Sequence, residues 1–240
     1  MSKSSELAPG RGGTAPQPRT DNRAAVAAFL AEARARPPRP EGGRGRLIFA
    51  LDATMSRQPT WDLACALQGE MFDAAARTGG LEVQLVYFRG HGEARASRWV
   101  GDAASLKRLM TGIACHGGLT QIERVLEHAV RASKAAPIGA LVLVGDAAEE
   151  SIDRLCHLAG GLALRGTRAF CFHEGRDAAA RRTFKEIARI TGGAYLPFDA
   201  RAAGELRALL GAVGAYAAGG RMALEAAGTG AARRLLADLG

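Results

Sequence analysis

The spacing of apolar residues changes at position 47 of this chain. After it, short apolar runs alternate with segments in which apolar residues recur every three or four positions. An uninterrupted apolar run predicts a strand buried on both faces, whereas the longer spacing predicts an amphipathic helix. The predicted strands cover residues 47–51, 81–88, 93–100, 139–144, 167–172 and 194–198. The predicted helices cover residues 61–77, 103–110, 120–134, 149–164, 178–190 and 202–218.

Strands that alternate with helices of this length are joined by crossover connections, which build a mainly parallel sheet. The predicted fold class is therefore α/β, with a doubly wound central sheet and helices on both of its faces. The 93–100 segment is more polar than the other strands and directly follows the 81–88 strand. We expect it to be an antiparallel strand at the edge of the sheet.

The residues on either side of this region differ from it in composition. The start of the chain is rich in Ser, Gly, Pro and Arg, and a short helical stripe around Phe29 and Leu30 precedes a Pro- and Gly-rich stretch. After Gly219 no element is predicted, although Leu235 and Leu236 are expected to pack locally. We therefore predict four segments: a disordered arm (1–20), a short helix with its linker (21–45), the α/β domain (46–218) and a C-terminal tail (219–240).

The basic excess of the chain belongs mostly to its first segments. The first 46 residues hold nine basic and four acidic residues, a net charge of +5, so the rest holds only +3 of the total +8. A nucleic-acid-binding domain usually carries a clustered basic face with a supporting motif, and the α/β region has neither. We therefore expect no nucleic-acid partner.

The four cysteines are far apart and form no C-x-x-C pair. This usage is typical of reduced thiols in a reducing compartment. The sequence has no apolar leader at its start and no apolar run of about 18 residues, so neither secretion nor a membrane span is predicted. The high Ala, Gly and Arg content is typical of a GC-rich bacterial genome. We expect a cytoplasmic location.

Side chains that carry oxygen donors stand at three of the predicted strand-to-helix junctions. Asp52 ends the 47–51 run and is followed by Thr54 and Ser56, while Thr120 and Asp146 each open a helical segment. A carboxylate at the end of a buried strand is costly unless it is paired, hydrogen-bonded or bound to a metal. Because the carboxyl ends of parallel strands share one edge of the sheet, we expect the five side chains to converge there. Two carboxylates with neutral hydroxyls suit a hard cation such as Mg²⁺.

Each of these residues also has an ordinary explanation. Thr120-Gln-Ile-Glu123 and Asp146-Ala-Ala-Glu149 both fit the capping-box pattern, in which the first side chain bonds an amide of the first helical turn. Ser56 could satisfy local backbone amides, and Glu149 and Glu150 would favour the dipole of their own helix. Only the conjunction of the three loops favours a metal site.

The set resembles the metal-ion-dependent adhesion site of the von Willebrand factor type A (VWA) domain family. That site is written D-x-S-x-S, then a distant Thr and a distant Asp, which match Asp52, Thr54, Ser56, Thr120 and Asp146 at similar separations. The resemblance implies a Rossmann-like VWA fold in which these five side chains hold Mg²⁺ or Mn²⁺. It also implies a protein partner whose Asp or Glu completes the metal coordination, and therefore a binding module rather than an enzyme.

Two further features bear on this resemblance, which covers about residues 46–218. Thr191-Gly-Gly-Ala-Tyr195 resembles the late T-G-G-x-Y/F segment of the family. Thr54 departs from the family pattern, because it stands where the first Ser is usual. It keeps the hydroxyl and adds a methyl group that crowds the metal shell.

An enzyme is the alternative interpretation. Haloacid-dehalogenase-like phosphatases also begin with an apolar strand that ends in an Asp, here Asp52 as nucleophile, and carry a later Gly-Asp metal loop. Lys134 would then bind the phosphate, and residues 144–150 would bind Mg²⁺. Position 54 argues against this reading, because it holds Thr where these enzymes have their general acid. The reading also leaves Thr120 without a role.

Overall fold

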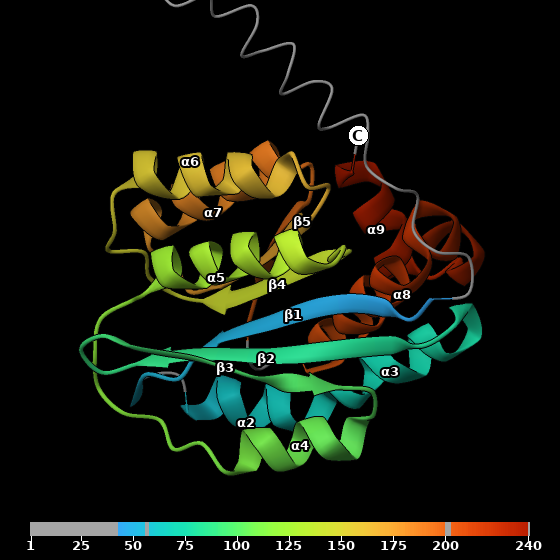
Figure 1. Ribbon diagram of the computed structural model, residues 1–240, viewed down its shortest axis with the longest axis horizontal. Coiled ribbons are helices and arrows are strands. Elements are labelled where there is room, and N and C mark those ends of the chain that lie inside the picture. Colours follow the sequence, from blue (N-terminus) through green and yellow to red (C-terminus); the bar gives the residue numbers. More distant parts are fainter. Residues whose placement is uncertain (1–42, 56–57, 200–202, 240) are drawn as a thin grey trace, which may run out of the picture. The chain divides into compact units, whose positions relative to one another are not determined.

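The structure is a computed structural model that describes residues 43–55, 58–199 and 203–239. The described strands form one six-stranded sheet in the order β3-β2-β1-β4-β5-β6 (Figure 1). Every neighbouring pair is parallel except β2 and β3, which are antiparallel. The strands are β1 (Gly45–Asp52), β2 (Leu81–Arg89), β3 (Glu93–Val100), β4 (Ala140–Gly145), β5 (Arg168–Glu174) and β6 (Ala194–Phe198). The predicted α/β fold class and its antiparallel edge strand are confirmed.

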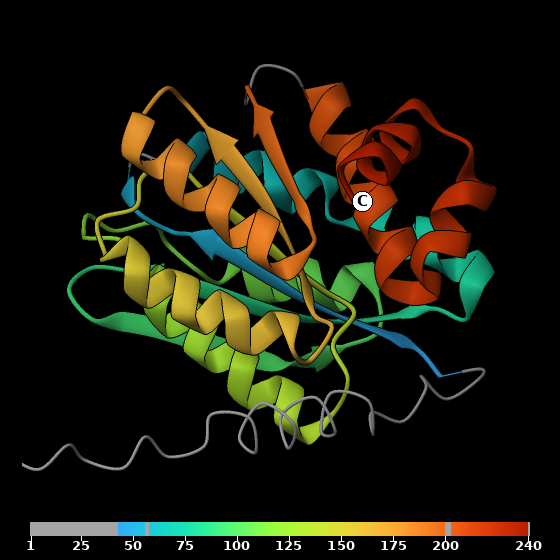
Figure 2. The same cartoon turned by 90° about the horizontal axis from the view of Figure 1, so that it is seen from above.

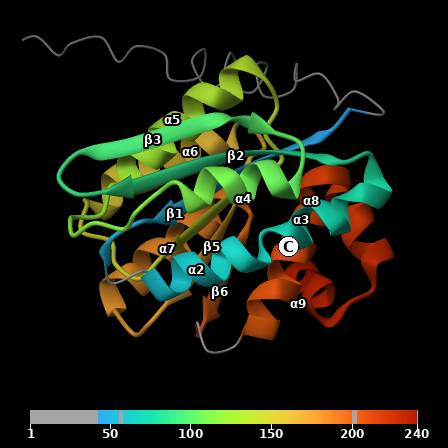
Figure 3. The same cartoon turned by 90° about the horizontal axis from the view of Figure 1, so that it is seen from below.

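Helices cover both faces of the sheet. The helices α5, α6 and α7 lie together on one face, as Figures 1 and 2 show, and α2, α3 and α4 lie on the other, which Figure 3 shows from below. The helices α8 and α9 complete the second layer. The helices are α2 (Gln58–Leu67), α3 (Gly69–Ala75), the 3₁₀ helix η2 (Ala76–Thr78), α4 (Ala103–Thr111), α5 (Ile122–Ala135), α6 (Ile152–Ala163), α7 (Ala178–Thr191), α8 (Ala203–Ala227) and α9 (Gly230–Asp238).

The central strand β1 explains why its sequence is apolar without interruption. Leu47, Phe49 and Leu51 belong to the hydrophobic core beneath α2, α3, α4 and α8, while Ile48 and Ala50 belong to the core beneath α5, α6 and α7. Successive side chains of a strand point to opposite faces, so a strand covered on both sides buries all of them. The strand β1 thus runs between the two cores, and its carboxyl end emerges where the carboxyl ends of the parallel strands lie.

Three elements differ from their sequence prediction. The segment predicted as one helix over 61–77 is divided into α2, α3 and η2. The helix predicted from residue 149 begins only at Ile152. The segment after Gly219, for which no element was predicted, continues α8 and then forms α9, with a break in helical geometry at Gly220 (φ 66°, ψ −153°). Glycine adopts that conformation without steric cost, so one residue redirects the chain.

The C-terminal helix α9 packs against α8 and β6. Leu235 is fully buried, and Leu236 packs on the same core, as their sequence suggested. The predicted arm, its short helix and most of the linker lie outside the described residues, so these segment limits stay predictions. Within the part of the chain that the structure describes, no helix is long and apolar enough to span a membrane.

Candidate functional site

The first candidate loop begins at the carboxyl end of β1. Asp52 is 4% exposed, and its Oδ1 accepts a hydrogen bond of 2.7 Å from the backbone N–H of Thr54. The backbone of Ala53 bonds in both directions, donating to the Phe88 carbonyl at 2.9 Å and accepting from the His116 amide at 3.0 Å. These bonds hold Asp52 and Thr54 at the edge of the sheet. Ser56 lies outside the described residues.

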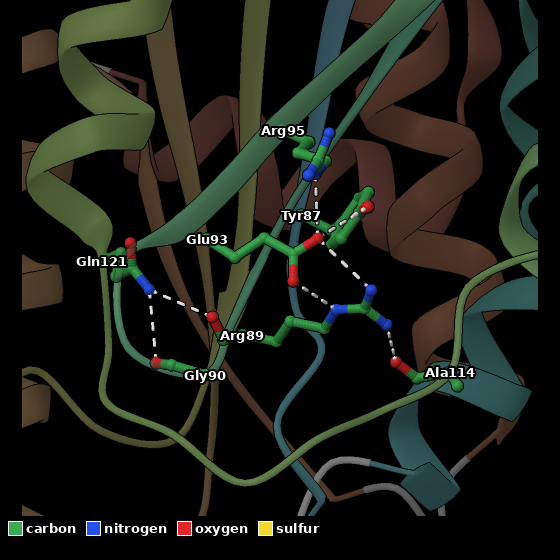
Figure 4. Close-up of polar contacts among 7 residues, drawn as sticks. All are labelled: Tyr87, Arg89, Gly90, Glu93, Arg95, Ala114 and Gln121. Carbon is green, nitrogen blue, oxygen red and sulfur yellow. Dashed lines mark hydrogen bonds and ion pairs between the residues drawn. The ribbon is translucent and has the colours of Figure 1, made fainter.

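The second loop, residues 112–121, is fastened to the turn between β2 and β3. The Leu119 amide donates to the Gly90 carbonyl at 3.2 Å, and Gln121 Nε2 donates to the carbonyls of Arg89 and Gly90 at 3.2 and 3.4 Å (Figure 4). A Cβ at Gly118 would lie less than 3.0 Å from the Gly90 backbone. The close approach therefore requires glycine at position 118, and it positions Thr120 at the end of the loop.

A charged network at the same turn supports this loop. Arg89 Nε donates to Glu93 Oε2 at 2.9 Å, and the other end of its guanidinium donates to the Ala114 carbonyl, as Figure 4 shows. Arg95 Nε also donates to Glu93, at 2.9 Å. Hydrogen bonds from Arg89 lower the pKa of Glu93 from 4.5 to about 2, and Arg95 adds to the effect. Glu93 is therefore ionised and keeps Arg89 in place.

Thr120 joins the second loop to the third. Its amide donates to Glu149 Oε2 at 2.7 Å, and its hydroxyl donates to Glu150 Oε2 at 2.8 Å. The Thr120 hydroxyl also accepts a bond of 3.0 Å from the Glu149 amide. The residues that form these bonds are 29 or 30 positions apart. A single threonine thus fixes the loop before α5 against the loop after β4.

The two predicted capping boxes are not formed, because neither helix begins where its box requires. The residue before α5 is Gln121 and the residue before α6 is Ser151, and neither side chain caps its helix. Glu150 instead accepts a bond of 3.3 Å from the Glu123 amide in the first turn of α5. The negative charge of Glu150 therefore lies at the amino end of α5, where the helix dipole is positive.

The third loop follows β4. Leu51 of β1 pairs with Val144 of β4 in parallel register, so Asp52, which ends β1, and Asp146, which follows β4, lie at the same end of neighbouring strands. A Cβ built on Gly145 would lie 4.0 Å from the Cβ of Asp52. The four candidate metal ligands that the structure describes therefore stand on adjoining loops. They are Asp52, Thr54, Thr120 and Asp146. The strand-end argument accounts for the loops after β1 and β4, whereas the loop with Thr120 follows α4 and is held against them by its hydrogen bonds.

Among the described residues, no three His, Cys, Asp or Glu side chains are grouped so as to hold a metal ion. A metal at this edge would therefore depend on hydroxyl oxygens beside the two aspartates. This donor set fits a hard cation such as Mg²⁺, which takes oxygen ligands and keeps several waters, and it lacks the nitrogen and sulfur ligands typical of structural zinc. The chemistry of the residues fits the predicted ion.

Sequence reasoning missed several groups at this edge. Glu174 ends β5 and accepts a hydrogen bond from the Thr60 hydroxyl. It follows the apolar run 169–172 after one residue, His173, so a strand-end rule like the one applied to Asp52 could have found it. Cys115 lies in the second loop, and burial raises the pKa of its thiol, with a further contribution from Asp52. The contacts of Glu149 and Glu150 could not be read from the sequence, because their partner Thr120 lies 29 or 30 positions away along the chain.

The geometry disfavours the phosphatase alternative. Lys134, the proposed phosphate-binding residue, lies in the last turn of α5, whereas Thr120 precedes the first turn. A helix of 14 residues is about 20 Å long. Lys134 therefore lies at the amino-end edge of the sheet, where β4 begins, and Asp52 at the opposite one. The two cannot contact the same phosphate.

No family model and no curated protein matches the sequence. Solved structures do match. The vWF domain of the pilus tip protein Mfa5 from Porphyromonas gingivalis has a TM-score of 0.53 at 10% identity, over 71% of this chain and 94% of that one. The SpRpn10 VWA domain has a TM-score of 0.51 at 10% identity, over 65% and 89%.

A third match is the mussel byssus protein PTMP1, whose structure has a zinc-occupied MIDAS motif. Its TM-score is 0.51 at 16% identity, over 69% of this chain and 44% of that one. Human Sec24c matches at a TM-score of 0.53 and 14% identity, but this chain spans only 32% of its length. Identities this low establish the architecture alone. The chain has the VWA fold: a six-stranded, mostly parallel sheet with one antiparallel strand and helices around it.

Proposed function

We propose that this chain is a protein-interaction module that binds an acidic side chain of its partner through Mg²⁺ or Mn²⁺. The metal ligands would be Asp52, Thr54, Ser56, Thr120 and Asp146. The observation that supports the proposal best is the linkage of the candidate loops at the carboxyl-end edge of the sheet. Thr120 bonds Glu149 and Glu150 just beyond Asp146, and the loop that carries it bonds Ala53 beside Asp52.

The hydrogen bonds of Thr120 are compatible with a metal-ligand role. Its hydroxyl proton is directed to Glu150, and one oxygen lone pair accepts from the Glu149 amide. A hydroxyl oxygen has two lone pairs, so one remains for a cation. Because Glu150 takes the proton, the hydroxyl presents an acceptor to a metal instead of a donor. In this proposal Glu150 orients the ligand Thr120.

A bound divalent cation would offer an open coordination site to an oxygen atom of the partner. The charges of Asp52 and Asp146 would neutralise the ion, and a carboxylate from the partner would then bind to it. This task is recognition, and it requires no nucleophile or general acid from the chain. A non-enzymatic role in the cytoplasm, with no nucleic-acid or membrane partner, belongs to the same proposal.

Calorimetric titration of Mg²⁺ and Mn²⁺ into the full chain tests the metal site. Replacing a ligand carboxylate by an amide removes one negative charge, so we expect Asp52→Asn to weaken metal binding by at least about tenfold. Asp73→Asn is the matched control, because Asp73 is an exposed aspartate on α3, away from the candidate loops. Equal affinity in Asp52→Asn and the wild type would contradict the assignment of the site.

The partner is tested separately. Proteins captured from a lysate with the wild-type chain are expected to be lost on addition of a chelator and from the Asp52→Asn variant, but retained by Asp73→Asn. Capture that survives both treatments would leave the fold unchanged and exclude a metal-dependent mechanism. Hydrolysis of a generic phosphate ester that Asp52→Asn abolishes would instead support the phosphatase.

A further inference from the structure

A hollow lies between the edge strand β3 and the helix α5, and none of the proposed metal ligands lines it. Its volume is about 320 Å³. Apolar side chains from β2 and β3 and charged side chains from α5 surround it. The lining residues are Val86, Ala94, Arg95, Ala96, Arg124, Glu127, His128 and Arg131.

The hollow exists because small residues face a helix at this edge of the sheet. Ala94 and Ala96 of β3 pair with Phe88 and Val86 of β2, so the two alanines lie on successive same-face positions. The face of α5 above them carries Arg124 and Arg131, seven positions apart, two turns of one helical face. Long cationic side chains therefore stand over a floor of methyl groups.

The lining carries an excess of positive charge. Arg124 and Arg131 contribute two guanidinium groups and Glu127 one carboxylate, whereas the guanidinium of Arg95 points to the other face of the strand and bonds Glu93. Glu127 lies 3.0 Å from Arg154, outside the hollow, and 3.9 Å from Arg131. Arg124 donates to the Gly92 carbonyl at 2.7 Å, and no carboxylate among the described residues pairs with it. An anion in the hollow would therefore meet guanidinium groups whose charge is only partly neutralised.

His128 is held so that it adds no charge of its own. Gln84 Nε2 donates to the Ser97 carbonyl at 2.8 Å, which turns the amide oxygen of Gln84 towards His128 Nε2, also at 2.8 Å. An amide oxygen only accepts, so His128 Nε2 carries the proton. Burial, and then the charge of Arg131, lower the pKa of His128. The ring is therefore neutral at pH 7, and the arginines alone attract the ligand.

We propose that this hollow binds the phosphate group of a small phosphate monoester. Guanidinium groups bind phosphate with two parallel hydrogen bonds, and an apolar floor with a few polar groups above it is typical of small-molecule sites. A volume near the lower limit of such sites suits a small ester rather than a nucleotide or a polymer. The site is independent of the proposed metal edge.

Calorimetry in a phosphate-free buffer at constant ionic strength tests the proposal on the full chain. The ligands are glycerol 3-phosphate, inorganic phosphate and succinate, the last carrying two charges without phosphorus. We expect glycerol 3-phosphate to bind more tightly than inorganic phosphate, because the apolar floor contacts the ester, and succinate to bind at least about tenfold more weakly. Equal affinity for succinate would overturn the assignment to phosphate, and equal affinity for inorganic phosphate would overturn the assignment to an ester.

Variants locate the binding. Arg124→Ala and Arg131→Ala are each expected to raise the Kd for glycerol 3-phosphate by about tenfold. Ala96→Leu should raise it similarly without changing any charge, since it places an isobutyl group in the hollow. Arg182→Ala is the matched control, because Arg182 is an exposed arginine on α7.

Two results would overturn the location. One is a Kd that Ala96→Leu leaves unchanged, and the other is an equal loss in Arg182→Ala, which would indicate attraction by net charge alone. The Mg²⁺ affinity of Arg131→Ala should equal that of the wild type, because Arg131 lies far along α5 from Thr120, so the test is separate from that of the metal site.

Discussion

Thr120 is the residue on which the candidate edge depends most. Its hydroxyl and amide together make three hydrogen bonds to two consecutive glutamates, and the side chain is only 8% exposed. Polar groups buried to this degree are costly when they lose their partners. One residue therefore couples the stability of the domain to the geometry of the proposed ligands.

Replacing this hydroxyl by a methyl group should be destabilising. Thr120→Val keeps the shape of the side chain but leaves the Glu149 amide without its acceptor and Glu150 Oε2 without its donor, so we expect a loss of about 1–3 kcal/mol. Urea unfolding measures this change. Thr111→Val is the control, because the Thr111 hydroxyl is exposed and should matter by less than about 0.5 kcal/mol. Equal effects in the two variants would show that the contacts of Thr120 contribute nothing specific.

Thr54 tests the role of the second proposed hydroxyl. Thr54→Val removes the oxygen at constant volume and should weaken Mg²⁺ binding by about tenfold, since one ligand is lost. Thr54→Ser keeps the oxygen and removes the methyl group, so its affinity should equal or exceed that of the wild type. The two are compared by calorimetry. Similar affinities for the Val and Ser variants would exclude the Thr54 hydroxyl from the metal shell.

Glu93 makes stability depend on pH in a defined range. Its pKa is about 2 in the folded chain, lowered from 4.5 chiefly by Arg89. A group with a depressed folded pKa stabilises fully above its unfolded pKa, and that contribution is lost as the pH falls through the folded value. The stability difference between the wild type and Glu93→Gln should therefore shrink between pH 4.5 and about 2. A difference that stays constant over that range in denaturant titrations would contradict the assignment.

At the scale of elements, the sheet edge is built by loops that fasten to one another. The turn between β2 and β3 holds residues 112–121 through Gln121 and Arg89, and that loop bonds both Ala53 and the segment after β4. The strands supply the positions, and these cross-loop bonds supply the orientation. A change in one loop is therefore expected to affect the others.

Two neighbouring glycines allow this linkage to be tested with a matched pair. A Cβ at Gly118 would meet the Gly90 backbone, whereas a Cβ at Gly117 would meet no atom within 4 Å. We expect Gly118→Ala to destabilise the domain by about 1–3 kcal/mol and to weaken metal binding, and Gly117→Ala to change stability by less than about 0.5 kcal/mol. Thermal unfolding and metal titration measure the two effects. Tolerance of Gly118→Ala would mean that the two turns are not tightly packed.

At the scale of the whole molecule, the reactivity of the four cysteine thiols measures how well the two hydrophobic cores are packed. Cys65, Cys115 and Cys171 are buried, Cys156 is half-buried, and none is paired with another cysteine. Burial raises the pKa of all four thiols, so little reactive thiolate exists at neutral pH.

The native chain should therefore react slowly with an alkylating reagent at pH 7. Cys156 should be modified first, because it is the most exposed of the four, and Cys171 last. Denaturant should make all four react at once. Mass spectrometry of partly alkylated protein gives the order, and rapid modification of Cys171 in the native state would contradict the packing of β5.

The order of strands and helices could be read from the sequence, because apolar spacing reflects which faces of an element are buried. The 47–51 run is apolar throughout since both of its faces are covered, and Asp52 marks where that cover ends. The division of 61–77 into α2, α3 and η2, and the continuation of α8 beyond Gly219, had no comparable signal. Both depend on how the helices pack over one another.

The sequence by itself determined the fold class and the antiparallel edge strand, and it predicted a set of oxygen-bearing residues as metal ligands. Only the tertiary structure decided that Thr120 bonds Glu149 and Glu150 rather than capping α5, and that the arginines of α5 stand over Ala94 and Ala96. The reason is the range of the interactions. Periodicity reports the neighbours of a residue along its own element, whereas these contacts join residues about 30 positions apart, whose pairing depends on how the sheet orders its strands.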